Sequence, residues 1–401
     1  MGSYFCFSCG KTTDDPEQTN AGMFCPQCGD RMDQKITDQE KGVDGKAPSD
    51  AVASAGERKG QKPEFTGSAA EYFRIWIVNT FLTIVTLGIY GAWAKVRNRQ
   101  YFYKNTAIDG HAFDYTANPL AILKGYLIVG TGFALYSLAG RYRPEYAFII
   151  LAIFFLVFPF LAYKSLRFFA HNSAYRNIRF RFSGTLGESY KTYLLYPLLI
   201  PFTLGFIVPY WAFRKKRYFY QHMAYGTSAG LFEGRPGPFY KVYLLTALAA
   251  IGSFVMIGLA IGGVIASTAK FLSGEPNMPV IIGLGILMYL VMLLAGTFVQ
   301  QYIYAWTTNY SWGASQLGAV RFISSLRAGR LFWIRISNIL AIVLSLGLLI
   351  PWAQVRKTRY ILDNMTVIAE QGLDDIAVAS VPEASAYGDA ATDFFDLEIG
   401  L

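Results

Sequence analysis

The feature that most constrains this chain is a segment that occurs three times, each copy centred on a Leu-Gly pair. The pairs are Leu87-Gly88, Leu204-Gly205 and Leu346-Gly347. In each copy a tyrosine follows fourteen residues after the leucine, at Tyr101, Tyr218 and Tyr360. Matched spacing at three places indicates internal duplication. The sequence therefore predicts one structural unit that is used repeatedly.

Each copy leaves its apolar stretch through tryptophan, arginine and tyrosine. The residues are Trp93, Arg97 and Tyr101, then Trp211, Arg217 and Tyr218, then Trp352, Arg356 and Tyr360. In the first and third copies they lie four apart and so share one helix face. Trp and Tyr favour the headgroup layer, and Arg stays on its aqueous side. Two interpretations remain open: membrane anchors, or a surface for anionic lipid headgroups or an acidic ligand.

The first copy carries the motifs TLGIYGAWAKVR and RQYFYKNT, followed by Gly110 to Phe113. In these motifs the sequence resembles the YjgN-like bacterial inner-membrane proteins, domain-of-unknown-function family 898. The resemblance covers about residues 65–370, and the second copy departs from the motif with PYWAFRKK at 209–216. It implies a multi-pass inner-membrane protein. The family has no established activity, so no catalytic residue is carried over.

Composition places most of the chain in a membrane, since 53% of its residues are hydrophobic and only 16% are charged. The net charge of +9 is divided unevenly along the chain. Residues 1–64 carry −3, residues 65–359 carry +21 and residues 360–401 carry −9. We attribute the positive charge to membrane topology and contact with anionic lipid, and expect no nucleic-acid partner.

Seven apolar segments are candidates for insertion: 75–93, 121–140, 146–163, 192–212, 242–269, 279–303 and 331–352. If all seven cross, the basic loops at 95–124 and 164–191 lie opposite the N-terminus, against the positive-inside bias. If the three Leu-Gly segments are instead re-entrant, 25 of the 28 basic residues in 65–359 lie on the cytosolic side. We therefore predict four spans, in hairpins 121–163 and 242–303, with three partial insertions.

Short motifs beginning with phenylalanine precede five of the predicted helices. They begin at Phe65, Phe113, Phe182, Phe232 and Phe322. Residues 179–183 alternate apolar and polar as a strand does. We expect these five segments to be strands that pair into a small cytosolic sheet.

All four cysteines lie near the N-terminus, at Cys6, Cys9, Cys25 and Cys28. Two CxxC knuckles separated by fifteen residues match the spacing of a zinc site, and four thiolates leave no open coordination position. We predict a zinc ribbon over 1–32 with one structural Zn²⁺. Two disulfides or four free thiols are the alternatives. Reduced thiols also favour a cytosolic N-terminus.

The remaining segments are polar. Residues 33–64 contain no aromatic residue, and residues 370–401 are acidic. We predict that both segments are solvated and disordered. The predicted domains are thus a ribbon at 1–32, a linker at 33–64, a membrane domain at 65–369 and an acidic tail at 370–401. The fold class is an α-helical multi-pass membrane protein built from internal repeats, plus the ribbon.

Few residues of the predicted membrane domain are candidates for catalysis. No phosphate-binding loop, HExxH motif or nucleophile elbow is present, and no carboxylate falls inside an apolar segment. We therefore expect no enzyme. Asn79 and Asn338 recur eight residues before the leucine of their copies. They either hydrogen-bond a broken helix backbone or line a polar path through the repeats.

Two functions remain in view. The first is a channel, carrier or lipid-handling protein, favoured by repeats and broken helices. The second is a membrane-bound sensor or scaffold that recruits a protein partner through the zinc ribbon, or lipids through its basic cytosolic face. The sequence names no ligand for either function.

Overall fold

A computed structural model describes residues 60–271 and 278–369, together with five short strands near the N-terminus. The chain divides into two compact units, Met1–Glu57 and Arg58–Leu401. In the first unit, β1 (Tyr4–Phe5) pairs with β2 (Thr12–Thr13) and β5 (Asp33–Gln34), and β3 (Glu17–Thr19) pairs with β4 (Gly22–Phe24). The predicted zinc ligands, residues 35–59 of the predicted linker and the acidic tail lie outside the described residues.

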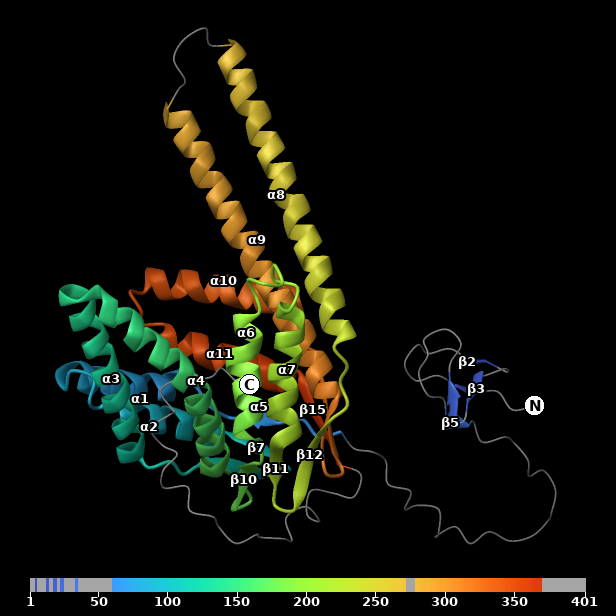
Figure 1. The fold of residues 1–401 in the computed structure, drawn as a ribbon. Coiled ribbons are helices and arrows are strands. Elements are labelled where there is room, and N and C mark those ends of the chain that lie inside the picture. The colour runs from blue at the N-terminus through green and yellow to red at the C-terminus, as the bar shows by residue number, and fades with distance from the viewer. Residues whose placement is uncertain are drawn as a thin grey trace. The chain divides into compact units, whose positions relative to one another are not determined.

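The second unit contains five helical hairpins within its described residues. Four of them pair two single helices: α1 (Ala69–Val85) with α2 (Gly91–Lys104), α3 (Pro119–Tyr142) with α4 (Pro144–Asn172), α8 (Gly237–Phe271) with α9 (Met278–Gly313), and α10 (Ala328–Leu344) with α11 (Ile350–Asp363). In the third hairpin along the chain, the first arm consists of α5 (Leu186–Tyr190), a π-helix (Lys191–Leu195) and α6 (Tyr196–Leu198), and the second arm is α7 (Val208–His222). Figure 1 shows α8 and α9 extending as a long pair beyond the other helices.

Short strands connect these hairpins into one antiparallel sheet of ten strands. In chain order they are β6 (Glu64–Phe65), β7 (Thr106–Ile108), β8 (His111–Tyr115), β9 (Ser173–Tyr175), β10 (Ile178–Phe182), β11 (Met223–Tyr225), β12 (Ser228–Phe232), β13 (Ser315–Leu317), β14 (Val320–Ser324) and β15 (Met365–Ala369). Each strand pairs with its neighbour in sequence. Gln61, just before β6, also pairs with Val367 of β15, with both N–H···O distances at 2.8 Å. This bridge joins the two edges and closes the sheet into a ring.

Every helical hairpin is attached to the ring in the same way. At the base of each hairpin the last residue of the strand before it pairs with the first residue of the strand after it: Phe65 with Thr106, Tyr115 with Ser173, Phe182 with Met223, Phe232 with Ser315 and Ser324 with Met365. One residue after the first strand, a backbone N–H donates to the carbonyl of the residue that immediately precedes the second strand. We call that acceptor the exit residue of its hairpin. The exit residues are Asn105, Asn172, His222, Ala314 and Asn364, with N···O distances of 2.9–3.0 Å.

The five strands predicted from the sequence are present as β6, β8, β10, β12 and β14. The expectation that these five strands pair with one another was wrong. Each is separated from the next by a strand that follows a helix directly, such as β9 after α4. The physical reason is that a β-hairpin turn of two residues, as at Arg176-Asn177, pairs adjacent strands before distant ones can meet.

The break predicted at each Leu-Gly pair is present. Leu87, Leu204 and Leu346 have φ between 48° and 50°, and the glycines that follow have φ between 85° and 93°. A left-handed leucine is strained, whereas glycine adopts such angles freely. The chain reverses direction at each turn, and the three leucine side chains are 88–95% exposed. Each Leu-Gly pair is thus the exposed apolar tip of a helical hairpin.

Three helices in the described part are long and apolar enough to cross a membrane: α3, α4 and residues Gly285–Gly313 of α9. They correspond to three of the four spans that the sequence predicted. The fourth, within α8, stays a prediction. By contrast, α1 and α10 have 17 residues each and are about 26 Å long. That is shorter than the ~30 Å hydrocarbon core of a bilayer.

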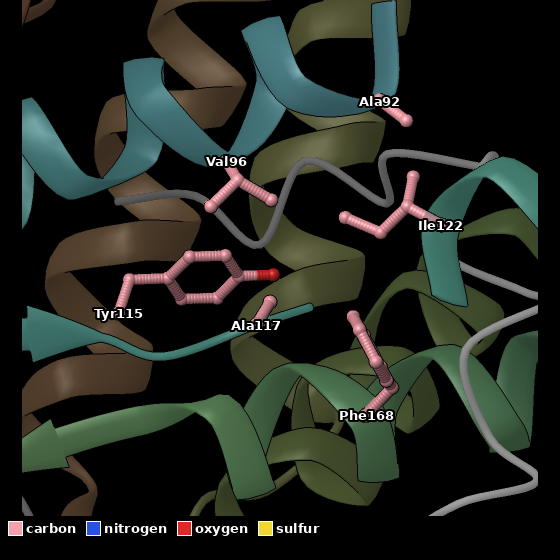
Figure 2. Packing of buried hydrophobic residues seen from close by; sticks show 6 residues of the cluster. All are labelled: Ala92, Val96, Tyr115, Ala117, Ile122 and Phe168. Carbon is pink, nitrogen blue, oxygen red and sulfur yellow. The ribbon is translucent and has the colours of Figure 1, made fainter. Parts of the chain in front are cut away.

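Where the helices meet the ring, apolar side chains form the core. One cluster contains Ala92 and Val96 of α2, Tyr115 and Ala117 at the end of β8, Ile122 of α3 and Phe168 of α4. These six side chains point toward one another between the two hairpins (Figure 2). Neighbouring hairpins are therefore packed against each other at their bases. Further out along the helices, large apolar side chains are exposed, as at Phe133 and Leu259.

Candidate ligand cavity

The closed sheet and the helix ends surround an apolar cavity of about 470 Å³. Its size lies within the range of small-molecule sites, about 300–1,000 Å³. Every one of the five hairpins contributes to its wall. The cavity is therefore a property of the ring, and no single hairpin could form it.

The wall repeats the same positions in each hairpin, counted from the exit residue. One residue after it, the wall contains Thr106, Ser173, Met223, Ser315 and Met365; three residues after it, Ile108, Tyr175, Tyr225, Leu317 and Val367. Alternate residues of a strand face one side, which explains this period of two. Two residues before the exit residue, the wall contains Tyr103, Ala170, Tyr220, Trp312 and Leu362. The first strands add Pro63, Phe113, Phe180, Gly230 and Phe322.

Among the described residues that line the cavity, none is charged. Several of its hydroxyl groups are also already bonded within the protein. The Ser173 Oγ lies 3.0 Å from the Tyr103 hydroxyl, and the Ser315 Oγ donates to the carbonyl of Ser311. The Tyr175 hydroxyl donates to the carbonyl of Ile108 at 2.8 Å. The surface offered to a ligand is therefore mainly aromatic and aliphatic.

Cationic side chains lie next to this wall on its helical side. The Arg99 guanidinium lies 5.6 Å from the ring centroid of Phe169, a wall residue, and its Nη1 donates to the Tyr115 hydroxyl at 2.8 Å. The Lys216 ammonium lies 5.9 Å from the ring centroid of Tyr220, also a wall residue. Burial lowers the pKa of Lys216 to about 8, and the charge of Lys215 adds to this effect.

The tyrosines of the three Leu-Gly copies hydrogen-bond to the residue that precedes the first helix of their own hairpin. The Tyr101 hydroxyl accepts from the N–H of Ser68 at 2.8 Å and donates to its carbonyl. Tyr218 donates to the carbonyl of Thr185 at 3.0 Å. Tyr360 accepts from the N–H of Arg327 at 3.0 Å. The residues bonded here are the N-caps of the first helices, so these hydroxyls close the base of each hairpin.

The tryptophans and arginines of the copies lie further from the ring. Arg97 donates to the Tyr90 hydroxyl at 3.2 Å, and the Tyr90 and Trp93 rings are stacked. Arg356 lies 5.0 Å from the Trp352 ring centroid, and Lys215 lies 3.8 Å from that of Trp211. Arg217 donates to Gln221 at 2.9 Å. Their contact with lipid headgroups stays a prediction.

Asn79 and Asn338 bridge the two helices of their hairpins. The Asn79 Nδ2 donates to the Asn98 Oδ1 at 2.9 Å. The Asn338 Nδ2 donates to the carbonyl of Ala353 at 3.2 Å, and its Oδ1 accepts from Arg356 at 3.1 Å. The residues that line the ring cavity include neither asparagine. Only Asn338 thus bonds backbone, whereas Asn79 bonds a side chain and its Oδ1 has no partner within the described residues. Both the backbone-bonding role and a polar path through these residues stay predictions.

A family model described as bacterial protein of unknown function (DUF898) matches residues 61–394. The chain belongs to this family. The matched region begins at Gln61, the residue that closes the ring against Val367, and includes all ten strands of the sheet. Membership of the DUF898 family therefore extends over the whole architecture that encloses the cavity.

Curated relatives match a shorter part of the chain. The inner membrane protein YjgN of Salmonella typhimurium is 31% identical over 140 residues, which are 34% of this chain and 35% of that protein. YjgN of Escherichia coli K12 is 28% identical over 142 residues, which are 35% and 36% of the two chains. The chain thus matches about a third of the length of these relatives. No solved structure matches it.

The cavity was not predicted from the sequence. Only three copies of the helical hairpin were identified, and the strands that follow the helices were not. A signal was present. Each exit residue precedes a short alternating segment, as in SAY after Asn172 and MAY after His222. Aligning on these segments would have revealed five attachment points to one sheet.

Proposed function

We propose that this protein is an integral inner-membrane protein that handles lipids by binding an apolar or amphiphilic molecule in the ring cavity. The observation that carries the proposal is the cavity itself. It has an uncharged, largely aromatic wall, and all five hairpins of the described part converge on it. Burying the apolar surface of a ligand contributes about 25 cal/mol per Å², so a wall of this kind favours hydrocarbon.

Placement in the inner membrane is supported by membership in the DUF898 family, by the similarity to YjgN inner membrane proteins and by three candidate spans. Exposed apolar side chains along α3, α4 and α9 are what a lipid-facing surface requires, because large exposed apolar patches are rare on soluble proteins. The described hairpins α3–α4 and α8–α9 would then be the membrane-crossing pairs.

The single sheet supports the re-entrant topology of the Leu-Gly hairpins. If all seven apolar segments crossed, β10 and β11 would lie on opposite sides of the membrane. They are paired, with Phe180 opposite Tyr225. This pairing supports hairpins that each enter and leave on the side where the ring lies, and the positive-inside bias favours the cytosol for that side. Leu87, Leu204 and Leu346 would then be tips inserted partway into the bilayer.

Equivalent attachment of all five hairpins also supports an origin by duplication. The strand pairs at each base share one register, and each exit residue accepts the same backbone hydrogen bond. We infer five related units, of which three kept short Leu-Gly hairpins and two lengthened into spans. A ring of units around one axis is a common way to build a shared central site.

The test is to fill the cavity and measure bound lipid. Leu317 lines the wall, and Leu317→Trp adds volume to the cavity. Leu127 of α3 is 59% exposed, so Leu127→Trp is the matched control. The full-length proteins are purified in detergent, and the lipids that remain bound are identified by native mass spectrometry. We expect bound lipid on the wild-type protein and the control, and a loss of at least fivefold on Leu317→Trp. Equal lipid content in all three would refute the proposal.

A further inference from the structure

We propose that the ligand of the ring cavity is a single-chain amphiphile with an anionic headgroup, held by a layer of donor groups one helical turn above the wall. The hydrocarbon chain fills the cavity, and a carboxylate or phosphate contacts Lys216, Thr308 and Thr358. This inference rests on the proposed function and adds the charge and position of the headgroup.

Helical geometry defines the layer. Its members lie six residues before the exit residue, in α2, α4, α7, α9 and α11: Arg99, Leu166, Lys216, Thr308 and Thr358. The wall residues of the same helices lie two or three residues before the exit residue. Positions three and four apart share one helix face, so each layer residue is stacked directly above wall residues.

Contacts in three hairpins place the layer at the cavity. Thr358 itself lines the wall. The Lys216 ammonium lies over the ring of Tyr220, and the Arg99 guanidinium lies over the ring of Phe169. Both rings belong to the wall. Thr358 is thus a wall residue itself, whereas Lys216 and Arg99 lie next to wall rings, and Arg99 is already bonded to the Tyr115 hydroxyl.

The fourth hairpin supplies hydroxyl groups that lack a partner. Thr308 is 1% exposed and Ser311 is fully buried, and within the described part of the chain neither side-chain hydroxyl has a hydrogen-bond partner. Thr308 is in the layer, and Ser311 is one turn closer to the ring on the same face of α9. Buried hydroxyls without partners are uncommon in folded proteins and mark sites where a ligand or water completes the bonding. Both groups can donate to an oxygen of a ligand.

The chemistry of the layer selects an anion. An ammonium group only donates, a guanidinium group only donates, and a threonine hydroxyl can donate. Within the described residues Lys216 has no carboxylate partner, and none of the residues that line the cavity is acidic. A buried cation is costly unless a counter-charge meets it. An anionic headgroup supplies that counter-charge, whereas a cationic or neutral headgroup does not.

The test compares ligands that share a chain and differ in headgroup. Full-length protein in detergent micelles is titrated with tritiated palmitate, and the bound label is displaced with unlabelled hexadecan-1-ol or with palmitoyl-lysophosphatidate. Wild-type protein should bind both anionic ligands at least tenfold more tightly than the alcohol. Lys216→Met should weaken palmitate binding at least tenfold and alcohol binding less than twofold. Lys124→Met, at an exposed lysine of α3, removes the same charge and should change neither.

A second variant separates ligand contact from packing. Thr308→Val keeps the shape of the side chain and removes its unpartnered hydroxyl. We expect this variant to be at least as heat-stable as the wild type and to bind palmitate severalfold more weakly. An unchanged affinity in both Lys216→Met and Thr308→Val, with the alcohol bound as tightly as palmitate, would overturn the anionic headgroup and leave the lipid cavity standing. Binding of every ligand that survives Leu317→Trp would instead overturn the cavity itself. If only one of the two anions binds, the headgroup is thereby identified as carboxylate or phosphate.

Discussion

The side-chain amide of Asn79 in α1 donates to the Oδ1 of Asn98 in α2 at 2.9 Å, across the middle of a hairpin whose tip is Leu87. Asn79 is 2% exposed. The bond links α1 and α2 within the first hairpin. Asn338, at the matching position of its copy, also bonds the second helix of its hairpin, but through the carbonyl of Ala353 and the guanidinium of Arg356.

Asn79→Ala should destabilise the first hairpin without preventing membrane insertion. The change leaves the Asn98 amide without this partner, and an unmet buried polar group costs about 1–3 kcal/mol. We expect a lower midpoint of thermal unfolding in detergent, and faster proteolysis near the Leu87 tip. Asn98→Ala should have a similar effect, and the double variant should cost less than the sum of the two, since one bond is lost in each case. Full additivity would show that the two residues act independently.

The closed ring predicts where introduced cysteines can be labelled. Thr227 and Ala319 lie in turns between strands of the sheet, whereas Arg143 lies between α3 and α4. A membrane-impermeant maleimide added to intact cells should label Arg143→Cys and not Thr227→Cys or Ala319→Cys. Wild-type protein, with its four native cysteines, gives the background. Labelling of either turn from outside would contradict a cytosolic ring.

Lys216→Met should stabilise the protein at neutral pH. The pKa of Lys216 is lowered from 10.5 to about 8, chiefly by burial, so the folded state disfavours the charged form. Below pH 8 the full penalty applies, and stability rises between pH 8 and 10.5 because the unfolded chain then binds the extra proton. Replacement by Met removes the penalty. We expect a midpoint of thermal unfolding roughly a few degrees above the wild type at pH 7. The difference should shrink toward pH 10.

The same experiment at Lys124 provides the control, because that side chain is exposed. Lys124→Met should leave the midpoint almost unchanged at both pH values. A wild-type protein whose stability does not change between pH 7 and 10 would show that Lys216 is neutralised by a bound counter-charge during purification. Extraction of lipid before the measurement would then restore the pH dependence.

The predicted zinc ribbon is tested by metal content. Purified full-length protein should contain about one zinc ion per chain, and Cys25→Ser should lose it because three thiolates hold the ion more weakly than four. Ser8→Ala, within the first knuckle, should retain it. Zinc is measured by plasma mass spectrometry after gel filtration. Recovery of metal-free wild-type protein with its cysteines in disulfides would contradict the ribbon.

The sequence by itself determined the local elements of this protein. The Leu-Gly pairs located the tips of three hairpins, because their matched spacing recurs in all three copies and glycine adopts the positive φ of a tight turn without strain. Hydrophobic length located the spans of α3, α4 and α9. Phe182 and Phe232 located strands through their alternating neighbours. Each of these signals lies within about twenty consecutive residues. The hydrophobic period and the composition of that one segment are therefore enough to predict the element.

Only the tertiary structure decided what those elements enclose. The bridge from Gln61 to Val367 joins residues about three hundred positions apart, and no local pattern specifies it. Closing the ring turned residues of nine strands, β7 to β15, toward one cavity, with Thr358 in its wall and Lys216 next to the wall residue Tyr220. Cavities arise from the relative placement of distant backbones, which depends on the summed packing of all five hairpins. The composition of any one segment therefore does not predict the cavity.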